Sequence, residues 1–525
     1  MRTTPRGAAT LAGLTIAALA LSACGGTAEG GGDANGEGDG ESIITAATGY
    51  ETDNYHPSST ASALAMGSNW HVMEGLFQLD MTTFEPYTAL ASEEGLTEVS
   101  ETEYEVTLRE DAKFSDGSQV TAEDVVVSFE KAADPDNIYG PMLAFIDEVT
   151  EVDETTVSIT LNQPFSLVEE RLALVKIIQA DATDDELTSQ PVGTGPWAYE
   201  SIDESTVSFV PNDHYNGSVP AQADAMEWSV ILDDTARTTA LQEGSVQVAE
   251  AVPADMQEVI TGAGAEVEAV QGFNLPFLMF NTTKEPFDDP RVRQALFYAI
   301  DEQQLVDNAM AGTAQPATSF LPEDHPNYNE ASNVFTHSPE TAEDLLEEAG
   351  VEDLSLNLVL TDHPWIAALG PQIQNDLGAV GIDVTLDEVA SASLYANYAD
   401  VEDPTYDVAL APGDPSVFGQ DPDLLMNWWY GDNIWTSQRS FWAETDTESF
   451  ENLHEILDDA VAAEGDEQQQ LWNDAFDLVS EEVPIYPLFH REVLTGYQPD
   501  ALSGFEPVST TGLSFIDVEP TSSEQ

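Results

Sequence analysis

Aromatic side chains crowd one short stretch in the second half of this 525-residue chain. Four of the nine tryptophans fall within fifteen positions, together with one tyrosine: Trp428, Trp429, Tyr430, Trp435 and Trp442. Broad, flat rings stack on sugar faces or cover the apolar side chains of a ligand. Such rings also fill hydrophobic cores, and core packing is the alternative for about half of them. We take Trp428 and Trp429 as candidate binding residues.

Three more residues could line a binding site. Tyr55 and His56 lie near the first predicted strand-to-helix connection, and Trp365 lies in the second half of the chain. Each offers a ring with a polar atom, which suits an enclosed ligand. An isolated histidine is more often structural than functional, so these three are weaker candidates.

Patterns typical of catalysis are missing from the sequence. It holds no GxSxG, HExxH or GxxxxGK[ST] motif, the eight histidines show no metal-ligand spacing, and there is one cysteine. Carboxylate pairs are too frequent among 98 acidic residues to be diagnostic. The sequence therefore predicts a protein that is not an enzyme and uses neither cofactor nor metal.

The charge is extreme, because 98 acidic residues against 13 basic ones give a formal charge of −85. Nucleic acids and anionic membrane surfaces bind through clustered Lys and Arg, so both are excluded as direct partners. A folded chain with this charge repels itself, and salt screens that repulsion. We interpret the composition as adaptation to brine, the alternative being an exported protein that is acidic for unrelated reasons.

The N-terminus reads as an export signal. Arg2 and Arg6 precede an apolar run from about residue 8 to 21 that is too short for a spanning helix, and Leu21-Ser22-Ala23-Cys24 follows. This tetrad resembles the lipobox of bacterial lipoproteins, which implies cleavage after residue 23 and a lipid on Cys24. An ordinary secretory signal with an incidental cysteine is the alternative. Residues 24–41, rich in Gly and acids, predict a flexible tether.

Beyond residue 42 the pattern is that of an α/β protein. Tyr104, Val106 and Leu108 alternate with polar residues, as strands do, and the same holds for 157–161 and 382–386. Thr121, with Asp124 three residues on, predicts a capped helix start. Ser338-Pro339 and Asp289-Pro290 predict two more helix starts, the first of these helices ending at Gly350.

Four segments, taken in order, resemble the bacterial extracellular solute-binding proteins of family 5, the peptide, nickel and oligosaccharide receptors of ABC importers. They are Asn69 to Asp80, Lys113-Phe114-Ser115-Asp116-Gly117 with Thr121 to Val126, Gly193-Thr194-Gly195-Pro196-Trp197, and Phe280 to Asp301. Most of these residues are turn and helix formers, so we do not assign them to ligand contacts.

The resemblance implies a two-lobed, periplasmic-binding-protein-like α/β fold of type II that encloses a small molecule. Lobe I would comprise 42–275 and 491–525, with an inserted subdomain at about 71–185, and lobe II would comprise 276–490. It further implies a monomer that delivers its ligand to an ABC permease from the outer face of the cell membrane.

Peptide receptors of this family carry an aspartate, after a strand, that pairs with the ligand's α-amine. Residues 406–410 read as that strand, and Asp414 is the matching position. Pro412 stands where Trp is common, and 415–420 lengthens the stretch before Asp421. A turn residue is thus the alternative for Asp414. The resemblance favours a peptide ligand, with an oligosaccharide or a sensing role as alternatives and nickel less favoured.

Overall fold

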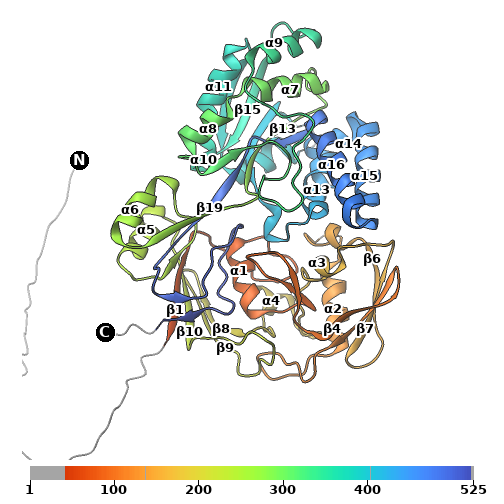
Figure 1. Cartoon of the computed structure of the whole chain (residues 1–525), viewed down its shortest axis with the longest axis vertical. Coiled ribbons are helices and arrows are strands. Elements are labelled where there is room, and N and C mark those ends of the chain that lie inside the picture. The colour runs from red at the N-terminus through yellow and green to blue at the C-terminus, as the bar shows by residue number, and fades with distance from the viewer. Residues whose placement is uncertain (1–41, 136, 402–403, 522–525) are drawn as a thin grey trace, which may run out of the picture. The chain divides into compact units, whose positions relative to one another are not determined.

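The computed structural model describes residues 42–135, 137–401 and 404–521. The predicted signal segment, Cys24 and the tether lie outside these residues. Within them, no helix combines the length and apolarity needed to cross a membrane. The described chain is a mixed α/β structure, which confirms the predicted fold class (Figure 1).

The first sheet has eight strands and joins distant parts of the chain. Its order is β12-β19-β11-β1-β10-β9-β8, with β14 pairing at β19. The strands are β1 (Ile43–Thr48), β8 (Trp197–Asp203), β9 (Thr206–Pro211), β10 (Ala225–Val230), β11 (Val248–Ala249), β12 (Glu266–Gln271), β14 (Ala314–Pro316) and β19 (Phe489–Tyr497). β1 runs parallel to β10 and β11, whereas β19 is antiparallel to β11, β12 and β14.

The second sheet has five strands in the order β16-β15-β17-β13-β18. They are β13 (Leu275–Phe280), β15 (Ser355–Thr361), β16 (Asp383–Val389), β17 (Val408–Gly413) and β18 (Ile485–Pro487). Every residue of β13 is buried, because the strand lies between β17 and β18 with neighbours on both faces. A buried strand of this kind reads as a continuous apolar run rather than an alternating one.

A third sheet lies within the segment that leads from β1 to β8. Its order is β4-β5-β7-β6, formed by β4 (Ala91–Ser100), β5 (Glu103–Leu108), β6 (Ile146–Glu151) and β7 (Thr156–Leu161). A short hairpin of β2 (Phe77–Leu79) and β3 (Pro86–Thr88) precedes it. Two further short strands, β20 (Leu502–Ser503) and β21 (Glu519–Pro520), pair near the C-terminus.

Helices cover these sheets. Around the first and third sheets lie α1 (Ala63–Val72), α2 (Ala122–Ala132), α3 (Val168–Leu172), α4 (Asp184–Ser189), α5 (Asp234–Gln242) and α6 (Gln257–Ala263). Around the second sheet lie α7 (Pro290–Ala299), α8 (Glu302–Ala309), α9 (Pro339–Glu348), α10 (Pro364–Ala367), α11 (Gly370–Ala379), α12 (Ser391–Leu394), α13 (Pro422–Tyr430), α14 (Trp442–Thr445), α15 (Thr447–Ala462) and α16 (Gly465–Glu482).

Local sequence signals explain the helix starts. The Asp124 carboxylate accepts a hydrogen bond from the Thr121 backbone N–H at 2.8 Å, which closes the predicted capping box before α2. Ser338 accepts from the Thr341 N–H at 3.3 Å before α9, and Asp289 accepts from the Arg291 N–H at 2.9 Å before α7. Gly350 follows α9 with φ of 76°, the left-handed conformation that favours glycine after a helix.

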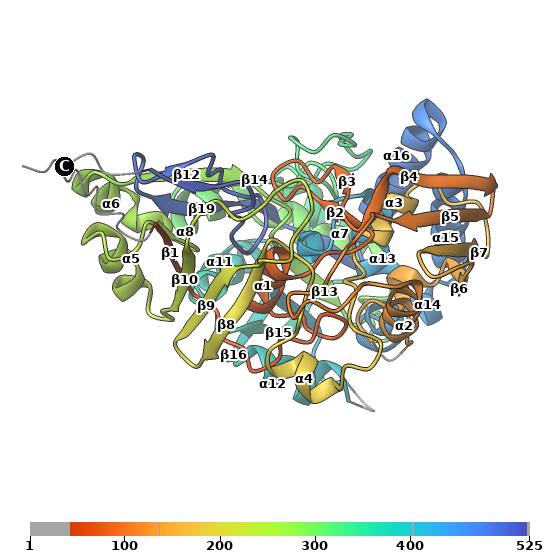
Figure 2. The same ribbon diagram turned by 90° about the horizontal axis from the view of Figure 1, so that it is seen from below.

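We use first lobe for the part built on the first and third sheets and second lobe for the part built on the second sheet. The residue boundaries given to the lobes above stay a prediction. Figure 2 shows α5 and α6 at one end and the third sheet at the other, with β13 and β15 between them in projection. Apolar packing continues from the third sheet into the second lobe, because Leu76, Val106, Phe277 and Leu410 belong to one buried cluster.

Candidate functional site

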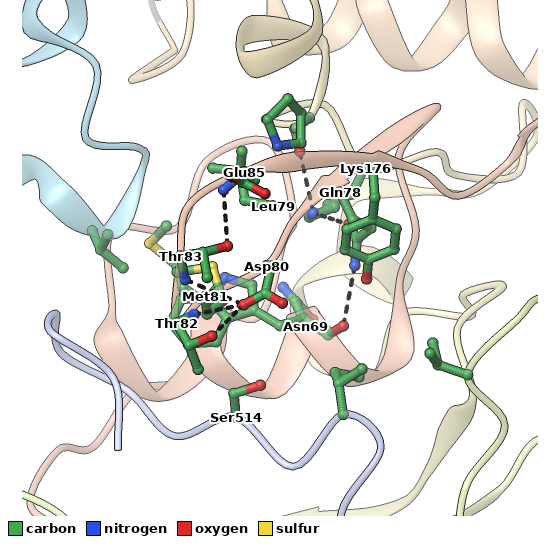
Figure 3. A pocket seen from close by; sticks show the side chains of 18 of the residues that line it. Asn69, Gln78, Leu79, Asp80, Met81, Thr82, Thr83, Glu85, Lys176 and Ser514 are labelled. Carbon is green, nitrogen blue, oxygen red and sulfur yellow. Dashed lines mark hydrogen bonds between the residues drawn. The ribbon is translucent and has the colours of Figure 1, made fainter. Parts of the chain in front are cut away.

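A cavity of about 490 Å³ opens where α1, the β2–β3 hairpin, the segment after α3 and the C-terminal segment meet (Figure 3). Two residues from the loop after β17, Val417 and Phe418, complete its wall. Both lobes therefore contribute to it. A cavity of this size, with apolar and polar lining, is typical of small-molecule binding sites.

The mouth and the interior of the cavity differ in charge. Four exposed carboxylates line the mouth: Asp80, Glu85, Glu506 and Asp517. The interior is formed by buried Met66, Asn69 and Trp70 with half-buried Lys176. Figure 3 shows Lys176 beside Gln78, across the pocket from Thr82 and Thr83.

Residues 414–423 comprise the loop between β17 and α13 and the first two residues of α13, and we call them the 414–423 loop. This loop carries an acid with one free oxygen. Asp414 Oδ1 accepts hydrogen bonds from the Ser416 N–H, at 3.1 Å, and from the Ser416 hydroxyl. Asp414 Oδ2 is buried and has no hydrogen-bond partner. Burial raises the pKa of Asp414 to about 6, although the hydrogen bonds from Ser416, the Asn274 side chain and the charge of Arg491 all act to lower it. A buried acceptor without a donor is costly, so this oxygen is poised to receive one.

Arg491, on β19, lies near Asp414 but is not paired with it. Its guanidinium stacks on the Trp365 ring, 4.1 Å from the centroid, and donates to Asn274 Oδ1 at 3.4 Å. Among the residues that the structure describes, no carboxylate lies within 4.0 Å of this group. Burial lowers the pKa of Arg491, although the charges of Tyr50 and Asp414 act in the opposite direction.

A second buried acid, Glu250, closes the first-lobe side of this polar region. Its carboxylate accepts from the Thr48 hydroxyl at 2.9 Å and from the Gly512 N–H at 2.6 Å. Burial raises the pKa of Glu250, and burial together with the charge of Glu250 raises the pKa of Tyr50. Glu250 has its partners within the protein, whereas Asp414 keeps one oxygen free.

The 414–423 loop is fastened to the first lobe along its whole length. The Thr510 hydroxyl lies 2.9 Å from the Ser416 hydroxyl and donates to it, because the Ser416 hydrogen is used on Asp414. Gln420 Nε2 donates to Ser509 Oγ at 2.9 Å. Between them, the Phe418 ring meets the Tyr139 ring edge to face, with centroids 5.6 Å apart. These contacts join the two lobes beside the cavity.

At the far end of the loop, one cation binds two acids of the second lobe. Arg171, 1 % exposed, donates to Asp421 Oδ1 at 2.8 Å and to Asp423 Oδ2 at 2.6 Å, and its other terminal nitrogen also reaches Asp421. Arg171 lies in α3 of the first lobe. Burying a cation is tolerable when it is fully paired in this way, and the ion pair links the two lobes.

The predicted binding residues occupy different surroundings. Trp365 lies against the Arg491 guanidinium, and the half-buried Trp428 ring lies 5.5 Å from Phe418 of the cavity wall. Trp429 is 2 % exposed and packs on Phe277, with centroids 4.8 Å apart.

Tyr55 and His56 lie outside the cavity wall, next to Pro57, which lines it. Tyr55 packs edge to face on Tyr199 at 5.8 Å. His56 Nδ1 accepts from the Ser58 N–H at 3.1 Å, and burial followed by the charge of Lys131 lowers its pKa. The ligand-binding roles of all six predicted residues stay predictions.

Sequence reasoning missed Arg171, Lys176 and Arg491. The composition could have pointed to them. Only 13 residues of this acidic chain are basic, so each basic residue was a candidate for a specific role. No cluster of metal-binding side chains occurs among residues 42–135, 137–401 and 404–521.

Comparison with known proteins identifies a family and relatives that this chain resembles. The family described as "Bacterial extracellular solute-binding proteins, family 5 Middle" matches residues 85–437. The glutathione-binding protein GsiB of Salmonella paratyphi A is 27% identical over 501 residues, which cover 91% of this chain and 94% of that protein.

Two solved structures share the fold. A dipeptide-binding protein from Pseudoalteromonas sp. SM9913, in complex with Met-Leu, aligns with a TM-score of 0.76 at 19% identity over 91% of this chain and 100% of the other. The protein AgaA from A. tumefaciens R10, in complex with agropinic acid, aligns with a TM-score of 0.78 at 24% identity over 91% and 99%. The predicted periplasmic-binding-protein-like fold is thereby confirmed.

Proposed function

The chain belongs to the bacterial extracellular solute-binding proteins of family 5, and from this premise we propose that its solute is a short peptide with a free α-amino group. Members of this family bind a small ligand outside the cytoplasm and hand it to an ABC permease. The open question is the chemistry of the ligand.

The free oxygen of Asp414 carries the proposal. A peptide ammonium would supply the donor that Asp414 Oδ2 lacks, and hydrogen bonds between ionised partners are about twice as strong as neutral ones. The low dielectric of a closed cleft strengthens the attraction further. The glutathione-binding relative and the Met-Leu complex support the same ligand class.

An oligosaccharide receives less support. The argument for a sugar depended on exposed tryptophan faces, but Trp429, Trp435 and Trp442 are 2%, 8% and 0% exposed. Packing in the second lobe takes up these rings. Trp428 alone of the cluster keeps part of its ring open.

A location outside the cytoplasm follows from the family, and attachment to the membrane surface by a lipid is part of our proposal. A lipid on Cys24 would hold the protein at the membrane, since one acyl chain alone binds only reversibly and more than one gives stable attachment. Mass spectrometry of the membrane-extracted protein tests this. A mature chain without acyl groups on Cys24 would contradict it.

Calorimetric titration tests the ligand class. Dipeptides and tripeptides are compared with their N-acetylated forms and with oligosaccharides of similar size. We expect peptides with a free amine to bind, N-acetylation to weaken binding at least about tenfold, or ~1.4 kcal/mol, and sugars not to bind. Asp414→Asn should remove most of the difference between free and acetylated peptides.

Asp432→Asn is the matched control, because Asp432 is an exposed aspartate of the same lobe. It should bind free and acetylated peptides as the wild type does. Equal affinity of the wild type for the two peptide forms would contradict the proposal.

A further inference from the structure

Lys176 presents an ammonium group to the cavity without an acidic partner. Its Nζ donates to Gln78 Oε1 and, at 3.2 Å, to the Ala173 carbonyl oxygen, and both acceptors are neutral. Within the described part of the chain, no carboxylate oxygen lies within 4.0 Å of Nζ. Glu74 acts on Lys176 from a distance, but Arg109 binds both of its oxygens, at 2.9 and 2.8 Å.

Of the four lysines, Lys113 and Lys176 have no carboxylate within 4.0 Å in the described part of the chain, whereas the other two are paired. Lys131 pairs with Asp184, and Lys284 pairs with Asp407 at 2.8 Å. A protonated lysine has three N–H donors, and two of those on Lys176 are used. Burial lowers the pKa of Lys176 to about 8, so the group still carries its charge at neutral pH.

An unpaired ammonium is costly to bury, and a ligand can supply the missing counter-charge. We propose that Lys176 receives a carboxylate of the bound ligand inside the cavity. The inference rests on the proposed function, because a peptide brings a carboxylate together with the amine assigned to Asp414. Asp414 does not itself line the cavity, but Val417 and Phe418, which follow it in the same loop, do. A peptide bound at both groups would therefore extend from the cavity past this loop.

The acidic mouth restricts which anions reach Lys176. Asp80, Glu85, Glu506 and Asp517 repel a ligand whose net charge is strongly negative. A zwitterionic or cationic peptide passes these acids without such repulsion. The cavity thus selects a carboxylate that is accompanied by a positive charge.

A double-mutant cycle tests the contact. Binding of a dipeptide and of its C-terminal amide is measured with the wild type and with Lys176→Met, which keeps an unbranched side chain one atom shorter and removes the charge. We expect amidation to weaken wild-type binding about tenfold or more and to change Lys176→Met binding by less than about threefold. Equal losses in both proteins would overturn the inference and leave the proposed function standing.

A second pair of ligands, Ala-Glu and Ala-Gln, shows whether Lys176 contacts the C-terminal carboxylate or a side-chain carboxylate. If the cycle shows coupling with an Ala-Glu to Ala-Gln change instead of with amidation, a side-chain carboxylate contacts Lys176, and the inference holds in that form. Lys176→Arg should restore most of the discrimination, because it keeps the charge. Lys284→Met, at a surface ion pair of the second lobe, is the control and should discriminate as the wild type does.

An NMR measurement that needs no peptide distinguishes failure of the Lys176 inference from failure of the peptide proposal. With ¹³Cε-labelled lysine the full chain gives four lysine signals, one for each of Lys113, Lys131, Lys176 and Lys284. Titration with acetate, as a single-carboxylate probe, should shift the Lys176 signal before the other three. A Lys176 signal that moves with neither acetate nor dipeptide would overturn the inference. If every peptide failed to bind while acetate shifted this signal, the peptide proposal would fail and the anion contact would hold.

Discussion

Two cations of the first lobe, the buried Arg171 and the half-buried Lys176, lie five residues apart in the sequence and have opposite surroundings. Arg171 holds two carboxylates of the second lobe, whereas Lys176 holds only an amide and a carbonyl oxygen. The acids of the 414–423 loop show the same contrast, because Asp421 and Asp423 are paired and Asp414 keeps a free oxygen. We infer that the saturated charges stabilise the closed form and that the unsaturated ones await a ligand.

The difference has an energetic basis. A buried charge with full partners is roughly neutral for stability while intact and becomes costly when one partner is removed. A buried charge without partners is costly from the outset. Removing Arg171 should therefore harm the protein, whereas removing Lys176 should relieve it.

The largest effect is expected at Arg171. Arg171→Met leaves Asp421 and Asp423 in the lobe junction without their cation, which costs about 3–5 kcal/mol when a buried pair is broken. Because these contacts exist in the closed form, we expect peptide affinity to fall by about two orders of magnitude or more. Calorimetry measures the affinity, and solution scattering should show a larger radius of gyration.

The control is Arg291→Met, which breaks an exposed pair with Asp289 that is worth about 1 kcal/mol at most. Adding Asp421→Asn and Asp423→Asn to Arg171→Met should recover part of the lost affinity. An Arg171→Met protein that binds peptide as the wild type does would show that this ion pair does not hold the lobes together.

An intermediate effect is expected from pH acting on Asp414. Burial raises the pKa of this carboxyl to about 6 in the unliganded protein, and a peptide ammonium binds only its ionised form. Affinity should therefore be constant above pH 7 and fall as pH drops through 6, reaching about one tenth at pH 5. The peptide amine stays protonated over this range. Asp414→Asn should bind weakly and without this pH dependence, and an unchanged profile would remove Asp414 from the site.

A smaller effect of opposite sign is expected on stability at Lys176. The folded-state pKa, lowered to about 8, lies below that of an unfolded lysine, near 10.4, so the buried charge costs stability at pH 7. The two pKa values correspond to about 3 kcal/mol at pH 7, and Lys176→Met also loses the hydrogen bonds to Gln78 and Ala173. The variant should therefore raise the unfolding free energy of the unliganded protein by about 1–2 kcal/mol at pH 7. The gain should shrink between pH 8 and pH 10 as the wild-type lysine loses its proton. Denaturant unfolding at pH 7 and pH 10 measures the gain and its loss. A Lys176→Met protein that is less stable than the wild type would show that the Lys176 charge does not destabilise the fold, in contradiction to the comparison with Arg171.

The smallest effect concerns salt. The overall charge of −85 predicts a melting temperature that rises with NaCl, because screening weakens repulsion between exposed acids. Buried pairs are screened much less, so the cost of Arg171→Met should change by no more than about 0.5 kcal/mol between roughly 0.1 and 1 M NaCl. Thermal scans of both proteins test this. A melting temperature of the wild type that does not rise would remove the interpretation of its acidity as adaptation to brine.

Local signals in the sequence located many of the elements. The alternation at Tyr104, Val106 and Leu108 corresponds to β5, and the capping signal at Thr121 corresponds to the start of α2. Both depend on neighbours within a few residues, which a sequence displays directly. The position of Asp414 after a strand was also readable, since the strand and the loop are contiguous.

The partners of the charged residues were not readable. Arg171 meets Asp421 across 250 positions, and β19 pairs with strands that lie more than 200 residues earlier in the chain. Nothing in the density of tryptophans distinguished Trp429, which fits against Gly413, from Trp428, which stays partly open. These differences depend on contacts between residues that are far apart in the sequence, and local sequence patterns do not reveal such contacts.

The 414–423 loop has a kinetic consequence. Releasing the solute requires the loop to part from Thr510, Ser509, Tyr139 and Arg171 as the lobes separate. Several contacts that must break together make spontaneous opening slow, so a loaded molecule should stay shut for long periods. A transporter that docks against both lobes and separates them would then determine the rate at which the ligand is released.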